Sequence, residues 1–142
     1  MFSKTFGHAL RATTYIATHG TQGNKVALSV LAQGLNIPQP VLGKVVQELV
    51  RHGIMDSTKG PNGGFFINNS TLQTPLTSIL KITDGSLLFT QCALGLKQCN
   101  PNHPCLLHHH FAVCRDGMIE VLEQKTIQDL VLQAEQEFVF LV

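Results

Sequence analysis

The first part of the chain alternates between apolar stripes with helical spacing and polar, glycine-containing breaks. From Ser3 to His19 apolar side chains recur at three- and four-residue steps, which predicts an amphipathic helix that Ser3 could cap. A second, short helix is predicted from Ala27, with Gly34 and Asn36 as its stop signals.

A third helix is predicted to begin within Ile37-Pro38-Gln39-Pro40, because proline fits the first turn of a helix. Gly53 would end this helix. The apolar stripe of the third helix is broad and consists of Val41, Leu42, Val45, Val46, Leu49 and Val50. Two short helices joined by a tight turn are typical of a helix-turn-helix.

A β-hairpin is predicted directly after this pair of helices. The stretch 54–58 and the stretch 65–67 are both compatible with strands, and Pro61-Asn62-Gly63-Gly64 between them has the composition of a tight turn. A hairpin that follows a helix-turn-helix is called a wing. We therefore expect residues 1–75 to form a winged helix-turn-helix DNA-binding domain.

The second part of the chain, residues 76–142, has three predicted segments. Leu76–Thr83 is a short helix, and Cys92–Cys105, with two prolines and a glycine, is an irregular loop. Arg115–Phe138 is predicted to be one long helix of about six turns. Its apolar side is larger than one small domain can cover, which suggests packing against a second copy. The expected fold is mainly α with a small β-hairpin wing and a long C-terminal dimerisation helix.

The charges are distributed unevenly along the chain. The formal net charge is +1, but residues 1–66 carry six Lys/Arg against two Asp/Glu, whereas residues 67–142 carry four against seven. This basic first half suits a nucleic-acid partner. No apolar run is long enough to span a membrane and the N-terminus lacks signal-peptide features, so we expect a cytoplasmic protein without a membrane partner.

The strongest chemical signal is a loop with three cysteines, Cys92, Cys99 and Cys105. In a reducing compartment such cysteines are more often metal ligands or redox groups than disulfides. The gaps between them are wider than the two-residue gaps of zinc knuckles, which favours a four-iron cluster over a single zinc ion. A structural zinc site, or three cysteines that only pack, are the alternatives.

A cluster also needs a fourth ligand, and His108 lies one helical turn after Cys105, near enough to share an iron. Other candidates are His8, His103, His109, His110 and Cys114. His109 and His110 are better interpreted as part of a polar helix face. Cys114 lies among Phe111, Ala112 and Val113, and we expect it in the core.

The predicted third helix and wing offer a surface for DNA. The residues expected to face the duplex are Gln39, Lys44, Gln47 and Arg51, with Lys59 and the backbone amides of Gly63 and Gly64 gripping phosphate at the wing. No phosphate-binding glycine loop, paired carboxylates or nucleophile with a base is present, so an enzyme is not expected.

Together these segments resemble the Rrf2 family of winged-helix transcription regulators. The similarity extends through SKTFGHALRATTYIA, NIPQPVLGKVVQELVRHGI, STKGPNGGF, LTSILKITDG and CALGLKQCNPNHPCLLH. The resemblance implies a homodimer that binds operator DNA. It also implies that Cys92, Cys99 and Cys105 ligate an iron–sulfur cluster of the 2Fe-2S or 4Fe-4S type, with His108 as the fourth ligand or His8 acting across the dimer.

The expected function is thus a transcriptional regulator that senses iron–sulfur, nitric oxide or redox status through this loop. Two alternatives remain open at this point. One is a metal-free repressor that senses oxidation through its thiols, and the other is a small iron–sulfur electron-transfer or carrier protein.

Overall fold

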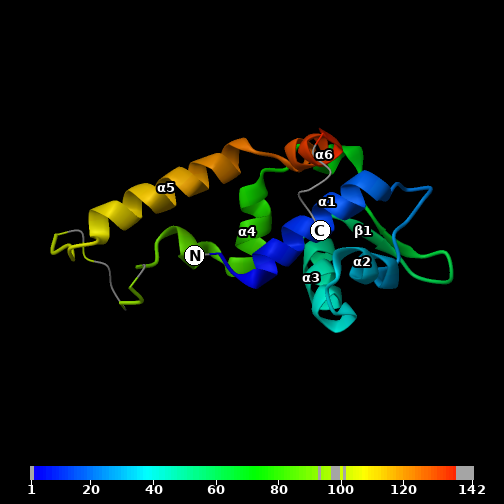
Figure 1. The fold of residues 1–142 in the computed structure, drawn as a ribbon, viewed down its shortest axis with the longest axis horizontal. Helices are drawn as coiled ribbons and strands as arrows, with labels where there is room; N and C mark the ends of the chain where they lie inside the picture. The colour runs from blue at the N-terminus through cyan, green and yellow to red at the C-terminus, as the bar shows by residue number, and fades with distance from the viewer. Residues whose placement is uncertain (1, 93, 97–99, 101, 137–142) are drawn as a thin grey trace.

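The computed structural model describes residues 2–92, 94–96, 100 and 102–136 (Figure 1). Most of the described elements gather around α1, whereas α5 runs away from them. None of the described helices is long and apolar enough to cross a bilayer. In chain order the elements are α1 (Lys4–His19), α2 (Leu28–Leu35), α3 (Gln39–Arg51), β1 (Asp56–Thr58), β2 (Gly64–Phe66), the short 3-10 helix η1 (Asn69–Thr71), α4 (Leu76–Asp84), the 3-10 helix η2 (Ser86–Phe89), α5 (His108–Gln124) and α6 (Ile127–Gln136).

Helix α1 is the central element of the core. It contacts α2, α3, α4 and α6, and it buries Phe6, Ala9, Ala12 and Ile16. The predicted cap is confirmed, because the Ser3 hydroxyl oxygen accepts a hydrogen bond from the Phe6 N–H at 3.1 Å. The same hydroxyl donates to Asp84 Oδ1 at 2.5 Å, and the Ser3 N–H donates to Asp84 Oδ2 at 2.8 Å. The start of α1 is therefore tied to the end of α4.

Replacing Ser3 with alanine should lower the free energy of unfolding by about 1 kcal/mol, the usual cost of losing an N-cap side chain. The change removes both the cap of α1 and one bond to Asp84. Urea unfolding curves would measure the loss. The replacement of Ser70, an exposed residue of η1, by alanine is the control and should shift the midpoint much less. Equal shifts for the two variants would contradict this role of Ser3.

Helices α2 and α3 confirm the predicted helix-turn-helix. Asn36 ends α2 in the left-handed conformation with φ of 52°, and its short polar side chain tolerates that backbone. Proline in the first turn of α3 and Gly53, with φ of 75°, directly beyond its C-cap bound the third helix as expected. Val41 departs from the prediction, because its side chain is exposed.

The wing is present as an antiparallel pair of strands. In β1 and β2 the residues pair as Asp56 with Phe66, Ser57 with Phe65 and Thr58 with Gly64. Val26, just before α2, forms a further bridge with Phe65 through two backbone hydrogen bonds of 2.9 and 2.8 Å. This bridge attaches the wing to the helix-turn-helix.

The long C-terminal helix predicted over Arg115–Phe138 is wrong as a single element. The structure has two helices, α5 and α6, that are separated at Lys125 and Thr126. Helix α5 starts earlier than predicted and leaves the body of the molecule, whereas α6 returns to pack on α1 (Figure 1). Phe138 lies outside the described residues.

A local hydrogen-bonding motif causes this break. The Thr126 N–H and hydroxyl donate to Asp129 Oδ2 at 2.8 and 3.0 Å, and the Asp129 N–H donates back to the Thr126 hydroxyl oxygen at 3.3 Å. This reciprocal pattern is a capping box, which starts a new helix. The segment before α4 also pairs with the break, because the Leu76 N–H donates to the Lys125 carbonyl and the Ile127 N–H donates to the Thr74 carbonyl.

The capping box also predicts a dependence of stability on pH. The hydrogen bonds from the Thr126 backbone and side chain lower the pKa of Asp129 below its ordinary value of 3.8. A carboxylate with a lowered pKa stabilises the fold above its unfolded-state pKa, and this contribution is lost as the pH falls through the folded-state value. Replacing Asp129 with asparagine should therefore lower the Tm at neutral pH.

The same Asp129→Asn replacement should lower the Tm by less as the pH falls below the ordinary carboxyl pKa of 3.8, because the unfolded-state carboxyl is protonated first and the advantage of the charged native Asp129 is progressively lost. Thermal unfolding followed by circular dichroism at several pH values would measure the difference. A difference that stays constant over this range would exclude the proposed contribution of the Asp129 charge.

Candidate nucleic-acid interface and cysteine pocket

One face of α3 is available to a partner. Leu42, Val45, Val46 and Leu49 are buried on its inner side. The four α3 residues predicted to face DNA, Gln39, Lys44, Gln47 and Arg51, are all exposed. The amphipathic pattern of the helix therefore places its polar side chains where they could meet a duplex.

Arg51 differs from the other three because it is paired within its own helix. Its guanidinium lies 2.5 Å from Glu48 Oε2, and His52 Nδ1 lies 3.9 Å from the same oxygen. The Arg51 side chain is 70% exposed, so this pair is solvated and easily exchanged for a phosphate. Arg51 therefore remains a candidate phosphate contact.

At the wing the Lys59 side chain is exposed to solvent, and Gly63 and Gly64 lie where a side chain would clash with the backbone. The Gly63 N–H donates to the Gly60 carbonyl at 2.9 Å, so this amide closes the turn, and the phosphate contact expected of the wing stays a prediction. A Cβ at Gly63 would lie 2.3 Å from the Thr58 carbonyl oxygen, and one at Gly64 would lie 2.6 Å from the Val26 carbonyl oxygen. Both positions therefore require glycine for the wing to close.

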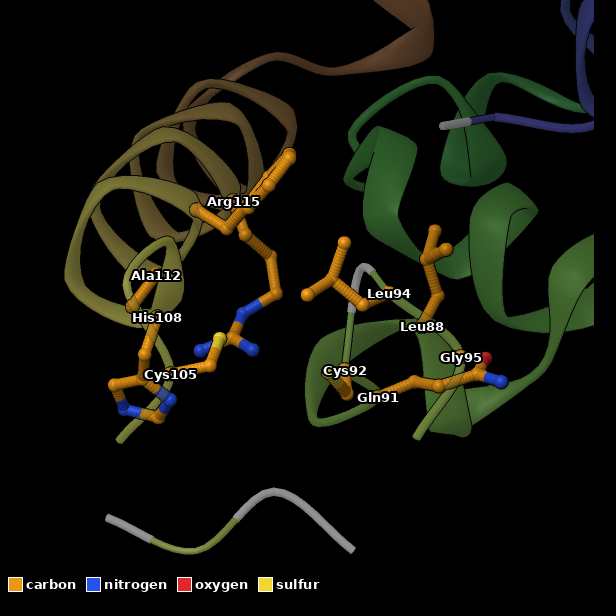
Figure 2. A pocket seen from close by; sticks show the side chains of 10 residues that line it. Leu88, Gln91, Cys92, Leu94, Gly95, Cys105, His108, Ala112 and Arg115 are labelled. Atoms are coloured by element: carbon orange, nitrogen blue, oxygen red, sulfur yellow. The ribbon is translucent and has the colours of Figure 1, made fainter. Parts of the chain in front are cut away.

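The cysteine loop borders a hollow of about 450 Å³ beside the first turns of α5 (Figure 2). Cys105 and His108 line it from the side of α5, and Cys92 lines it from the segment after η2. Cys92 and Cys105 are both half-buried. The remaining lining residues are Leu88, Gln91, Leu94, Gly95, Phe111, Ala112 and Arg115. Two of the three predicted thiol ligands and the preferred fourth ligand thus share one pocket.

The other candidate ligands that the structure describes do not line this pocket. Cys99 lies outside the described residues. His103, His109 and His110 are exposed, and His8 is half-buried on α1. Cys114 is exposed on α5, so the prediction that it lies in the core is wrong. The reason is that α5, as described, has no fully buried residue, and it is Leu122, two turns after Cys114, that packs partly buried against the core.

The thiol and imidazole groups in the pocket are of the types that bind iron or zinc. Thiolate sulfur is the usual ligand of iron–sulfur clusters, and imidazole nitrogen can replace one thiolate. Within the described part of the chain, no three His, Cys, Asp or Glu side chains are close enough together to hold one metal ion. A complete ligand set therefore requires Cys99 or a residue from a second copy.

Arg115 is a pocket residue that the sequence analysis did not single out. Its side chain extends from α5 between Cys105 and Cys92 (Figure 2), and its Nε donates to Asp116 Oδ1 at 3.0 Å. Arg115 follows His108 by seven residues, which is two helical turns and the same face. That spacing was the available signal, but it required knowing that α5 begins at His108.

Comparisons with known proteins identify the family of the chain. Residues 2–133 match the sequence model of the family described as "Rrf2: Iron-dependent Transcriptional regulator". A protein of Aquifex aeolicus that carries the name of an HTH-type transcriptional regulator is 29% identical over 133 residues, which cover 92% of this chain and 91% of the relative. The HTH-type transcriptional regulator IscR of Pectobacterium carotovorum is 25% identical, over 90% of this chain and 77% of the relative.

The fold is shared with a solved structure, that of CymR, the global cysteine regulator of B. subtilis. The TM-score is 0.75 at 20% identity, over 94% of this chain and 97% of CymR. The similarity therefore includes the helix-turn-helix, the wing and the two C-terminal helices. Because the family match covers nearly the whole chain, this protein belongs to the Rrf2 family of transcriptional regulators and is not an enzyme.

Proposed function

We propose that the chain acts as a cytoplasmic homodimer that binds operator DNA through α3 and the wing, with an affinity that depends on an iron–sulfur cluster. Cys92, Cys99 and Cys105 would supply three ligands, and His108 the fourth. The single observation that carries this proposal is that Cys92, Cys105 and His108, from two separate segments, line one pocket.

The position of this pocket supports a link to DNA binding. The pocket is bordered by η2 and by the start of α5, and α4 contacts both η2 and another part of helix α5. Helix α4 packs on α1 and α3 in turn. A change in the cysteine loop would therefore be transmitted through packed helices to the element that we expect in the major groove.

When bound, a cluster would supply a centre whose redox state and integrity respond to oxidants and nitric oxide. By ligating the cluster, the three cysteines and His108 would hold the cysteine loop and the start of α5 in one position relative to each other. For a tenfold change in operator affinity, the cluster needs to favour one dimer geometry by only about 1.4 kcal/mol. Half-sites are about 34 to 36 Å apart in such dimers, so a small displacement of the two α3 helices is enough.

The exposed surface of α5 supports a dimer. In the single chain, large apolar side chains stand in solvent along and just before this helix. They are Leu106, Leu107, Phe111, Val113 and Val121. Exposed apolar side chains on a helix that leaves the molecular body fit an interface with the same helix of a second copy.

The test compares protein purified without oxygen in cluster-loaded and cluster-free forms. Iron and sulfide content and visible absorption identify the cluster, and titration of palindromic DNA at several salt concentrations measures the affinity. We expect different affinities for the two forms and a steep loss of affinity with salt. Equal affinities would refute the sensing role and leave a DNA-binding protein.

The same samples separate the rival functions. Protein without iron or colour whose affinity still changes on oxidation would be a thiol-based repressor, which the shared pocket of Cys92 and Cys105 also allows. One tightly bound zinc ion per chain would indicate a structural metal. An iron–sulfur protein without salt-dependent DNA affinity would be an electron-transfer or carrier protein.

Two variants identify the fourth ligand. Because His108 lines the pocket and His8 does not, replacing His108 with alanine should reduce the iron content and alter the visible spectrum, whereas replacing His8 should not. The reverse result would show that His8 completes the site across the dimer. Iron analysis and absorption spectra of the anaerobic proteins measure both outcomes.

A further inference from the structure

A shallow depression lies between α2 and α3, on the face that we propose meets DNA. It is lined by Leu28, Gln39, Pro40, Gly43, Lys44 and Gln47. Three of these residues, Gln39, Lys44 and Gln47, are the exposed α3 residues that we expect in the major groove. The other three, Leu28, Pro40 and Gly43, are apolar, and we refer to them together as its apolar floor.

The apolar floor is open to a ligand because Gly43 has no side chain that would fill it. Gly43 is buried in the middle of α3, and a Cβ there would lie 3.3 Å from Leu28 Cδ2. The Leu28 side chain of α2 therefore lies close to the α3 backbone at Gly43. A longer side chain at position 43 would point into the depression. Pro40 adds a rigid, exposed ring one turn earlier on the same face.

Few groups in a DNA major groove match an apolar floor with a polar rim. Among the base edges, thymine alone presents a methyl group, and the other groups there are hydrogen-bond donors and acceptors. The rim also fits an A·T pair, because a glutamine side chain such as that of Gln39 or Gln47 can bind the N6 and N7 atoms of adenine.

We propose that the depression over Leu28, Pro40 and Gly43 receives the 5-methyl group of a thymine and so fixes an A·T pair in each half-site. This inference rests on the proposed DNA binding but is independent of the cluster. It identifies Gly43, a residue with no side chain to contact a base, as a determinant of sequence specificity.

The probe is a set of duplexes selected from a random pool with the full-length native protein. Each thymine of a selected duplex is then replaced by deoxyuridine, which removes the methyl group and keeps the pairing. At one position per half-site we expect affinity to fall about fourfold, the effect of about 0.8 kcal/mol for one buried methyl-sized group. Replacing both symmetry-related thymines should lower the affinity about sixteenfold.

The Gly43→Gln variant tests the assignment to this depression. Its long polar side chain would occupy the apolar floor, so the preference for thymine over uracil at that position should disappear. Glutamine is a better helix former than glycine, and the one close contact is with the flexible end of Leu28, so α3 should persist. The Thr5→Gln variant, on an exposed position of α1, is the control and should keep the preference.

Three results would overturn the inference. If uracil replaces every thymine without loss of affinity, no methyl group is read. If Gly43→Gln retains the preference for thymine, the methyl group is read elsewhere. If the native protein selects no duplex at all, the proposed DNA binding fails and this inference fails with it, which distinguishes that case from the first two.

Discussion

Replacing Cys105 with serine is expected to remove nearly all iron and visible absorption from the anaerobically purified protein. The thiolate is the ligand that iron–sulfur clusters require, and a serine hydroxyl, which has the same shape, is not a comparable donor. Cys105 lines the pocket together with Cys92 and His108, so its loss removes one of the few donors that the chain offers there. Operator affinity should then no longer depend on iron.

The matched control for this experiment is Cys114→Ser. Cys114 is also a cysteine of the same part of the chain, but it is exposed on α5 and does not line the pocket. We expect this variant to keep its iron and the iron-dependent change in DNA affinity. Full iron content in Cys105→Ser, or its loss in both variants, would place the cluster somewhere other than the pocket.

The helices around α1 could be predicted from the sequence because their boundaries are local. Ser3 caps its own helix, Asn36 and Gly53 adopt positive φ where the following chain must turn, and Pro40 stands in the first turn of α3. Each of these signals needs only the neighbouring residues. The pattern of buried positions in α3 then follows from its helical periodicity.

The C-terminal part could not be predicted as well because its structure depends on distant segments. The apolar periodicity continues from α5 into α6, and it hides the capping box of Thr126 and Asp129. The break at this point is completed by Thr74 and Leu76, some fifty residues earlier in the chain. The spacing of apolar residues does not predict these hydrogen bonds between distant segments.

The cysteine pocket lies between these two cases. The spacing of the cysteines and histidines predicted the chemistry, but only the fold shows that the segment after η2 and the start of α5 face the same hollow. For Cys114 the sequence prediction is wrong, because its apolar sequence neighbours are interpreted as part of the core although Cys114 is exposed. In a chain that forms a dimer, such a neighbourhood equally describes a surface that a second copy covers.

Replacing Val113 with aspartate is expected to convert the protein to a monomer and to lower its operator affinity about 10² to 10⁴-fold. Val113 is 73% exposed on α5 in the single chain, so the substitution should leave the fold of that chain unchanged. In the proposed dimer the new carboxylate would lose its water and face its own copy, which is unfavourable without a partner charge. The loss of affinity follows because the second half-site no longer binds intramolecularly.

Sedimentation velocity measures the oligomeric state, circular dichroism confirms that the fold is kept, and DNA titration gives the affinity. The control is Gln133→Asp, which adds the same charge at an exposed position of α6. This control should remain dimeric and bind DNA as the native protein does. If Val113→Asp stays dimeric, the α5 face is not the interface. A folded Val113→Asp monomer that retains native affinity would show that one subunit suffices for the operator, and the proposed coupling through dimer geometry would then have to be abandoned.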